Sequence, residues 1–86
     1  MASEIIATGT GSATSSDVVV GAGESLAVGL KGLPAGTFAS VRVELYDGAA
    51  YQYAGSLDSD TRLRVISAPG TYRFIRTAGT CGVFSG

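Results

Sequence analysis

Few side chains in this 86-residue sequence could do chemistry, and none has a partner that would activate it. The sequence contains one cysteine, Cys81, and no histidine, so neither a Ser-His nor a Cys-His pair can form. Cys81 lies in an apolar run, where a buried thiol stays protonated and unreactive. We therefore expect no enzymatic activity.

The sequence also lacks the residues that would form a metal or cofactor site. Zinc draws mainly on cysteine and histidine, which are nearly absent. The Asp58-Ser59-Asp60 stretch is similar to part of a calcium loop, but calcium takes six or more oxygen ligands and no further acid is close by. The glycines match neither a dinucleotide-binding nor a P-loop pattern. We expect a polar turn at residues 58–60, no metal and no cofactor.

Charge and length restrict the partners. A net charge of −1 gives no basic footprint, so we expect no nucleic-acid binding. The sequence shows no leader and no membrane-spanning run, so we expect synthesis in a cytoplasm and no membrane partner. A chain of this length buries only roughly 60% of its surface on folding. With one cysteine and no internal disulfide, self-association is the expected remedy.

The pattern of the sequence predicts a series of short β-strands. Thirteen glycines divide it into runs of period two, and no run has the spacing of a helix. We predict an all-β fold, a small antiparallel β-sandwich or barrel of about seven short strands with an extended N-terminal arm. The strand candidates are residues 5–8, 17–20, 25–30, 38–46, 49–55, 61–66, 71–76 and 81–85.

Alternation within these runs also predicts which side chains point inward. An Asp47-Gly48 turn favours a tight hairpin between 38–46 and a return strand at 49–55. The arginines of 61–66 are expected outward. The predicted inward residues are Ala39, Val41, Val43 and Leu45, then Leu63 and Val65, then Tyr72 and Phe74.

The sequence divides into a Thr/Ser/Gly-rich N-terminal strand and arm, residues 1–16, and a single β domain, residues 17–86. The arm is either an extended connector or a strand that pairs with the sheet edge of another subunit. In the second case its removal is expected to leave the domain folded. Its candidate interface residues are Ile5, Ile6, Thr8 and Thr10.

Charged side chains fall on the outward positions of several predicted strands. They form either a solvated face with cross-strand pairs, each contributing about 0.2 to 1 kcal/mol, or an interface for an acidic protein surface. Arginine suits the second role because its planar fork binds carboxylates through two hydrogen bonds. The residues concerned are Arg42, Glu44, Arg62, Arg64 and Arg73.

Tyrosines near the Asp47-Gly48 turn suggest another role. Tyr51 and Tyr53 share a face of the predicted return strand, and aromatic rings are what a glycan-binding module presents to sugars. Tyrosine is also common at strands and protein interfaces, so both interpretations stay open.

The end of the chain carries a resemblance. The stretch VISAPGTYRF at residues 65–74 is followed by CGVF at 81–84, and a Gly-Glu-Ser-Leu turn at 23–26 precedes an apolar strand. In these features, in length and in its Thr/Ser/Gly-rich opening, the sequence resembles small tailed-phage virion proteins of the capsid decoration or cement type.

That resemblance implies an all-β subunit that binds across the capsomers of a phage head as a trimer or dimer. Its partners would be the major capsid protein and copies of itself, its location the capsid surface of the virion, and it would have no catalytic residues. Weak contacts add through avidity once a multimer engages several capsomers. The alternative is a fibre, spike or adaptor recognition module that contacts host glycan through Tyr51 and Tyr53.

Overall fold

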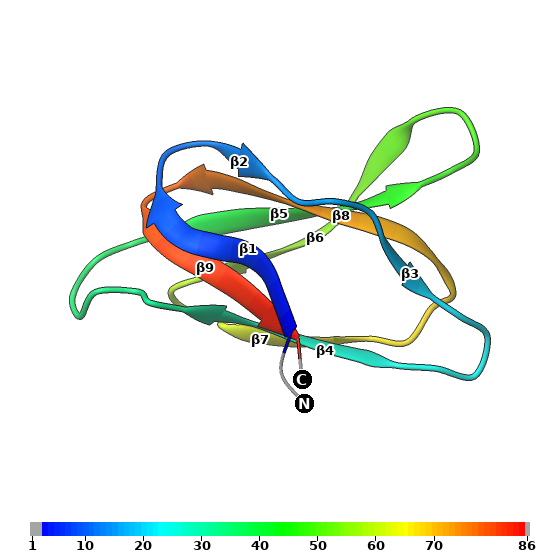
Figure 1. Cartoon of the computed structure of the whole chain (residues 1–86), viewed down its shortest axis with the longest axis horizontal. Coiled ribbons are helices and arrows are strands. Elements are labelled where there is room, and N and C mark those ends of the chain that lie inside the picture. Colours follow the sequence, from blue (N-terminus) through cyan, green and yellow to red (C-terminus); the bar gives the residue numbers. More distant parts are fainter. Residues whose placement is uncertain (1–2, 86) are drawn as a thin grey trace.

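The strands form two antiparallel sheets that pack face to face. The computed structural model describes residues 3–85, and every regular element in this range is a β-strand (Figure 1). The strands are β1 (Ser3–Thr10), β2 (Ala13–Thr14), β3 (Val18–Val20), β4 (Leu26–Lys31), β5 (Ser40–Tyr46), β6 (Tyr51–Asp58), β7 (Leu63–Ile66), β8 (Gly70–Ala78) and β9 (Thr80–Ser85). The predicted all-β fold is confirmed, with nine strands in the described residues rather than about seven.

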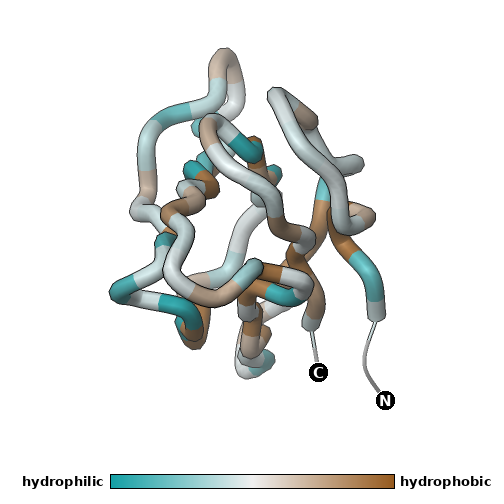
Figure 2. The backbone as a smooth tube through the Cα atoms, turned by 90° about the vertical axis from the view of Figure 1, so that its left-hand side faces the viewer, coloured by the Kyte–Doolittle hydropathy of each residue, from teal (hydrophilic) through white to brown (hydrophobic). Residues whose placement is uncertain are grey.

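The chain alternates between the two layers. The first sheet has the order β1-β9-β4-β7, and the second has β2 and β3 along β8, followed by β5 and β6. The corner from β8 to β9 turns at Gly79, with φ of 80°, where a Cβ atom would lie 2.2 Å from the carbonyl oxygen of Phe38. Only glycine fits this corner. Ser3 pairs with Ser85, so the two described ends lie side by side (Figure 1 and Figure 2).

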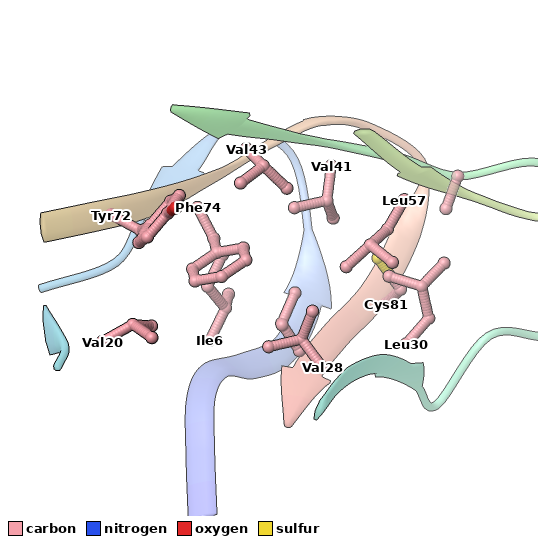
Figure 3. Close-up of a cluster of buried hydrophobic side chains, with 12 residues drawn as sticks. Ile6, Val20, Val28, Leu30, Val41, Val43, Leu57, Tyr72, Phe74 and Cys81 are labelled. Atoms are coloured by element: carbon pink, nitrogen blue, oxygen red, sulfur yellow. The ribbon is translucent and has the colours of Figure 1, made fainter. Parts of the chain in front are cut away.

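Buried side chains from both sheets meet between the layers (Figure 3). The inward face predicted for 38–46 is confirmed, because Ala39, Val41 and Val43 are buried and Leu45 packs against the core. The strand itself begins at Ser40 rather than at Phe38. Tyr72 and Phe74 are buried as predicted, and the Tyr72 hydroxyl donates to the carbonyl oxygen of Ala68 at 2.7 Å. The core residues are Ile6, Val20, Val28, Leu30, Ala39, Val41, Val43, Leu57, Tyr72, Phe74, Cys81 and Val83.

The prediction for strand β7 is wrong. Leu63 and Val65 are 69% and 70% exposed, because the register places them opposite Gly29 and Ala27 on the outer face of the first sheet. Arg64, expected outward, lies opposite the core residue Val28. An arginine can occupy this position because β7 is an edge strand, where a long side chain reaches solvent past the end of the core.

The N-terminal segment is part of the sandwich. β1 pairs with β9 and β2 with β8 of the same chain. Ile6 is in the core, and the hydroxyl of Ser15 accepts a hydrogen bond from the backbone N–H of Phe74 at 2.9 Å. Removal of residues 1–16 would strip a sheet edge and a core side chain. We therefore expect that truncation to unfold the sandwich rather than to spare it.

Arg76 fastens this segment to the rest of the fold. Its side chain is 6% exposed and lies on the core side of β8. Its Nε donates to the carbonyl oxygen of Gly11 at 2.6 Å, and its Nη1 donates to those of Ala7 at 3.0 Å and Cys81 at 2.6 Å. A buried cation requires such acceptors, since its desolvation would otherwise be very costly. One guanidinium thus joins β1, the corner that follows it, and β9.

Replacing Arg76 by methionine should lower the free energy of unfolding by roughly 3 kcal/mol, because three carbonyl groups, that of Cys81 buried and those of Ala7 and Gly11 partly so, lose a charged donor. Arg76→Lys should recover part of this loss. Lys31→Met, which removes an exposed ion pair with Glu4, should cost less than about 1 kcal/mol. Urea denaturation followed by circular dichroism measures all three. Equal losses for the Arg76 and Lys31 variants would contradict the fastening role of Arg76.

Candidate interaction face on the second sheet

The outer face of the second sheet gathers a charged cluster. Glu44 on β5 accepts a hydrogen bond from Arg73 Nε on Oε1 and one from Arg42 Nε on Oε2, each at 2.7 Å. Arg42 precedes Glu44 by two residues on β5, and Arg73 lies opposite Glu44 on β8. Glu44 is 8% exposed, whereas both arginine side chains stay partly exposed. The structure therefore brings these three predicted residues together.

The guanidinium groups of Arg42 and Arg73 also contact tyrosine rings. Arg42 Cζ lies 4.7 Å from the ring centroid of Tyr53, and Arg73 Cζ lies 3.8 Å from that of Tyr51. Such cation–π contacts are attractive and restrict the rotamers of the arginines. We refer to Arg42, Glu44, Tyr51, Tyr53 and Arg73 as the Arg–Tyr face.

The β5–β6 hairpin presents the tyrosines. Tyr46 pairs with Tyr51 and closes a four-residue loop, so the return strand begins two residues later than predicted. Asp47 Oδ1 accepts hydrogen bonds from the backbone N–H groups of Ala50 and Ala49, each at 2.8 Å, and these bonds lower the pKa of Asp47. The tip of this hairpin extends past the rest of the sandwich (Figure 1).

Tyr51 is held from three directions. Besides Arg73, its ring contacts Tyr46 at 5.1 Å between centroids, and its hydroxyl donates to the carboxylate of Asp17. This hydrogen bond raises the pKa of the Tyr51 phenol. Tyr53 is 58% exposed. Of the two tyrosines predicted to contact glycan, only Tyr53 presents a largely exposed ring.

Electrostatics keep the cluster charged. The hydrogen bond from Arg73 is the main reason why the pKa of Glu44 lies below its usual range, and Arg42 contributes in the same direction. Burial of the carboxylate acts in the opposite direction and is outweighed. At neutral pH the face therefore presents two cations that share one anion.

The other two predicted arginines lie elsewhere. Arg64 is on β7 of the first sheet, and its Nε donates to the carbonyl oxygen of Ser56 on β6 at 2.7 Å. Arg62 directly precedes β7 and is exposed. Both belong to an open edge of the sandwich rather than to the Arg–Tyr face.

The four residues predicted for the arm differ in exposure. Ile6 lies in the core and Ile5 is partly buried against it. Thr8 and Thr10 are exposed, and the hydroxyl of Thr10 shares a hydrogen bond of 2.6 Å with that of Thr80 on β9. Only the exposed pair and part of Ile5 remain available to a partner.

Sequence reasoning missed two residues that organise these features. Alternation places Arg76 on the same face as Tyr72 and Phe74. An arginine in an otherwise apolar row could therefore have indicated a buried, hydrogen-bonded guanidinium. Asp17 gave no signal, because its contact with Tyr51 joins positions 34 residues apart.

The described residues offer little for catalysis. Residues 3–85 contain no group of three or more His, Cys, Asp or Glu side chains that could hold a metal ion. Burial raises the pKa of the Cys81 thiol, which favours the unreactive protonated form. No helix in this range is long and apolar enough to cross a bilayer.

Comparison with known proteins gives no relative. The chain matches no protein-family model, no curated protein and no solved structure. The exposed faces described above are therefore the basis for assigning a function.

We expect the free energy of unfolding to fall in acid. The folded-state pKa of Glu44 lies below its ordinary value of 4.5, so the stability that this carboxylate contributes is complete above that pH. It is lost as the pH falls through the lower folded-state value. Glu44→Gln should flatten this loss, and urea denaturation between neutral and strongly acidic pH measures it. Asp60→Asn, at an exposed turn, should keep the wild-type profile; the same profile for Glu44→Gln would exclude the cluster as its origin.

Proposed function

We propose that this chain is a structural virion protein that decorates and stabilises a phage capsid, and that it acts by binding rather than by catalysis. The observation that carries the proposal is the Arg–Tyr face, in which two partly exposed arginines are held in place by Glu44 and by tyrosine rings. The resemblance of the C-terminal stretch to capsid decoration proteins supports the choice of partner.

The geometry of the face suits an acidic protein surface. Arginine has five N–H donors, and within residues 3–85 the hydrogen bonds of Arg42 and Arg73 use only Nε. Their terminal Nη groups are thus open to carboxylates of the major capsid protein. Because both side chains are already ordered, binding costs little additional rotamer entropy. Arginine and tyrosine are also the residues that most often dominate binding energies at protein interfaces.

A glycan-binding role has less support from the same residues. Stacking on sugar rings needs free aromatic faces, and the ring of Tyr51 contacts both Arg73 and Tyr46. Binding to a repeating shell also suits a small domain, since individually weak contacts add when several copies engage neighbouring capsomers.

The direct test is the position of this chain on purified virus particles. We expect cryo-electron microscopy to show its density on capsomers, and particles stripped of it to rupture more readily on heating. Adding the purified protein back should restore both properties. Density confined to fibres, or particles that lack the chain, would rule out the decoration role.

A charge-neutral variant tests the Arg–Tyr face itself. Arg42→Gln/Glu44→Gln/Arg73→Gln removes all three charges together, so no buried carboxylate is left alone. Occupancy of stripped capsids should fall roughly tenfold or more, because charged interface contacts are lost. Lys31→Gln changes the net charge by the same one unit on the other sheet and should bind normally. Unchanged occupancy of the triple variant would refute this binding mode.

A further inference from the structure

The first sheet has two open edges that run in opposite directions. Its outermost strands are β1 and β7, and among the described strands β1 pairs only with β9 and β7 only with β4. Open edges are templates for another strand, because their outward backbone N–H and C=O groups have no strand partner. On β1 the carbonyl oxygen of Ala7 already accepts a hydrogen bond from Arg76. Three successive antiparallel pairings separate β1 from β7, so these two strands are antiparallel to each other.

The β7 edge is apolar and basic. Leu30 N–H donates to the carbonyl oxygen of Arg62 at 3.0 Å, so Arg62 directs its backbone groups toward β4. In an antiparallel ladder the alternate residues, Leu63 and Val65, then direct theirs to the open edge. Their side chains are the most exposed apolar groups of this sheet. Arg64 on this strand and Arg62 directly before it are exposed and face the side of the second sheet.

The β1 edge is acidic. A groove of about 400 Å³ opens between this edge and β3 of the second sheet. It is lined by Glu4 and Ile5 of β1, by Asp17 and Val18 at β3, and by three serines. The lining thus contains two carboxylates and apolar groups; Glu4 is also paired with Lys31 of β4, and Asp17 accepts the hydrogen bond from Tyr51.

We propose that β7 of one copy adds to β1 of the next, so that the first sheet continues from copy to copy as an antiparallel ladder. The opposite directions of the two edges give the required orientation without inverting either copy. In this arrangement Arg62 and Arg64 of the added strand lie on the side of the groove that carries Asp17. Leu63 and Val65 lose exposed area beside β1. The charge of these arginines beside Asp17, together with the opposed directions of the two edges, therefore specifies a second copy of this chain as the occupant.

The contact is head-to-tail, since it joins two different edges, and it closes into a ring only when the rotation between copies closes. The trimer implied by the resemblance is one such ring. This inference rests on the proposed function only in that a ring would engage several capsomers. The edge contact itself is tested without capsids.

A backbone test uses Val65. Its N–H points to the open edge, so Val65→Pro removes a donor that the chain itself does not use. Sedimentation velocity from low micromolar to millimolar concentration should give an oligomer for the wild type and for Val65→Thr, and a single-chain mass for Val65→Pro. A single-chain mass for the wild type throughout, or an unchanged oligomer for a folded Val65→Pro, would overturn the proposal.

A charge-reversal pair gives the same test with the backbone unchanged. Arg62→Glu/Arg64→Glu makes both edges acidic, and Glu4→Lys/Asp17→Lys makes both basic, so each variant alone should sediment as a single chain. An equimolar mixture should reassemble, because acidic and basic edges then alternate. Glu24→Lys, in the turn between β3 and β4 and outside the groove lining, is the control and should keep the wild-type mass. Wild-type oligomers of both reversal variants, or no reassembly on mixing, would contradict the edge pairing.

The two proposals can fail separately. Oligomers that form through these edges but do not occupy capsids would refute the decoration role and leave the edge contact standing. Capsid binding that depends on the Arg–Tyr face while Val65→Pro remains oligomeric would refute the edge contact alone.

Discussion

The buried guanidinium of Arg76 is the contact on which the rest of the sandwich depends. It extends from the second sheet to carbonyl oxygens of β1, of the following corner and of β9 in the first sheet. Because all three acceptors are backbone groups, they are brought together only when the chain has folded back on itself. Together with the pairing of β1 with β9 and of β2 with β8, this side chain docks the N-terminal segment and leaves β1 as a defined edge.

Arginine has two further uses here, and its surroundings decide which. Arg42 and Arg73 meet a carboxylate and aromatic rings on a sheet face, so they are ordered but still exposed. Arg62 and Arg64 lie along an open strand, where positive charge either discourages pairing or selects an acidic edge. The proposed capsid contact uses the first pair and the proposed contact between copies uses the second. The two proposed contacts would therefore use different arginines on different sheets.

The failure at β7 shows a limit of alternation. Period two divides a strand into two faces, but it does not say which face is covered. On β5 and β8 the apolar face was the buried one, as a central strand requires. On β7 the apolar residues Leu63 and Val65 face outward, because the register to β4 fixes the faces and an edge strand has little of the opposing layer above it. The same exposure makes β7 a candidate interface.

Local features of the sequence determined the strands other than β2, the hairpin at Asp47-Gly48, and the buried rows on β5 and β8. Each depends on neighbouring residues or on composition, which a single sequence displays directly. The tertiary structure decided which strands are neighbours. Only the sheet register brings Arg73 to Glu44, 29 residues away, and Asp17 to Tyr51, 34 residues away. The Arg–Tyr face and the two opposed edges arise from such distant pairings, which local periodicity does not encode.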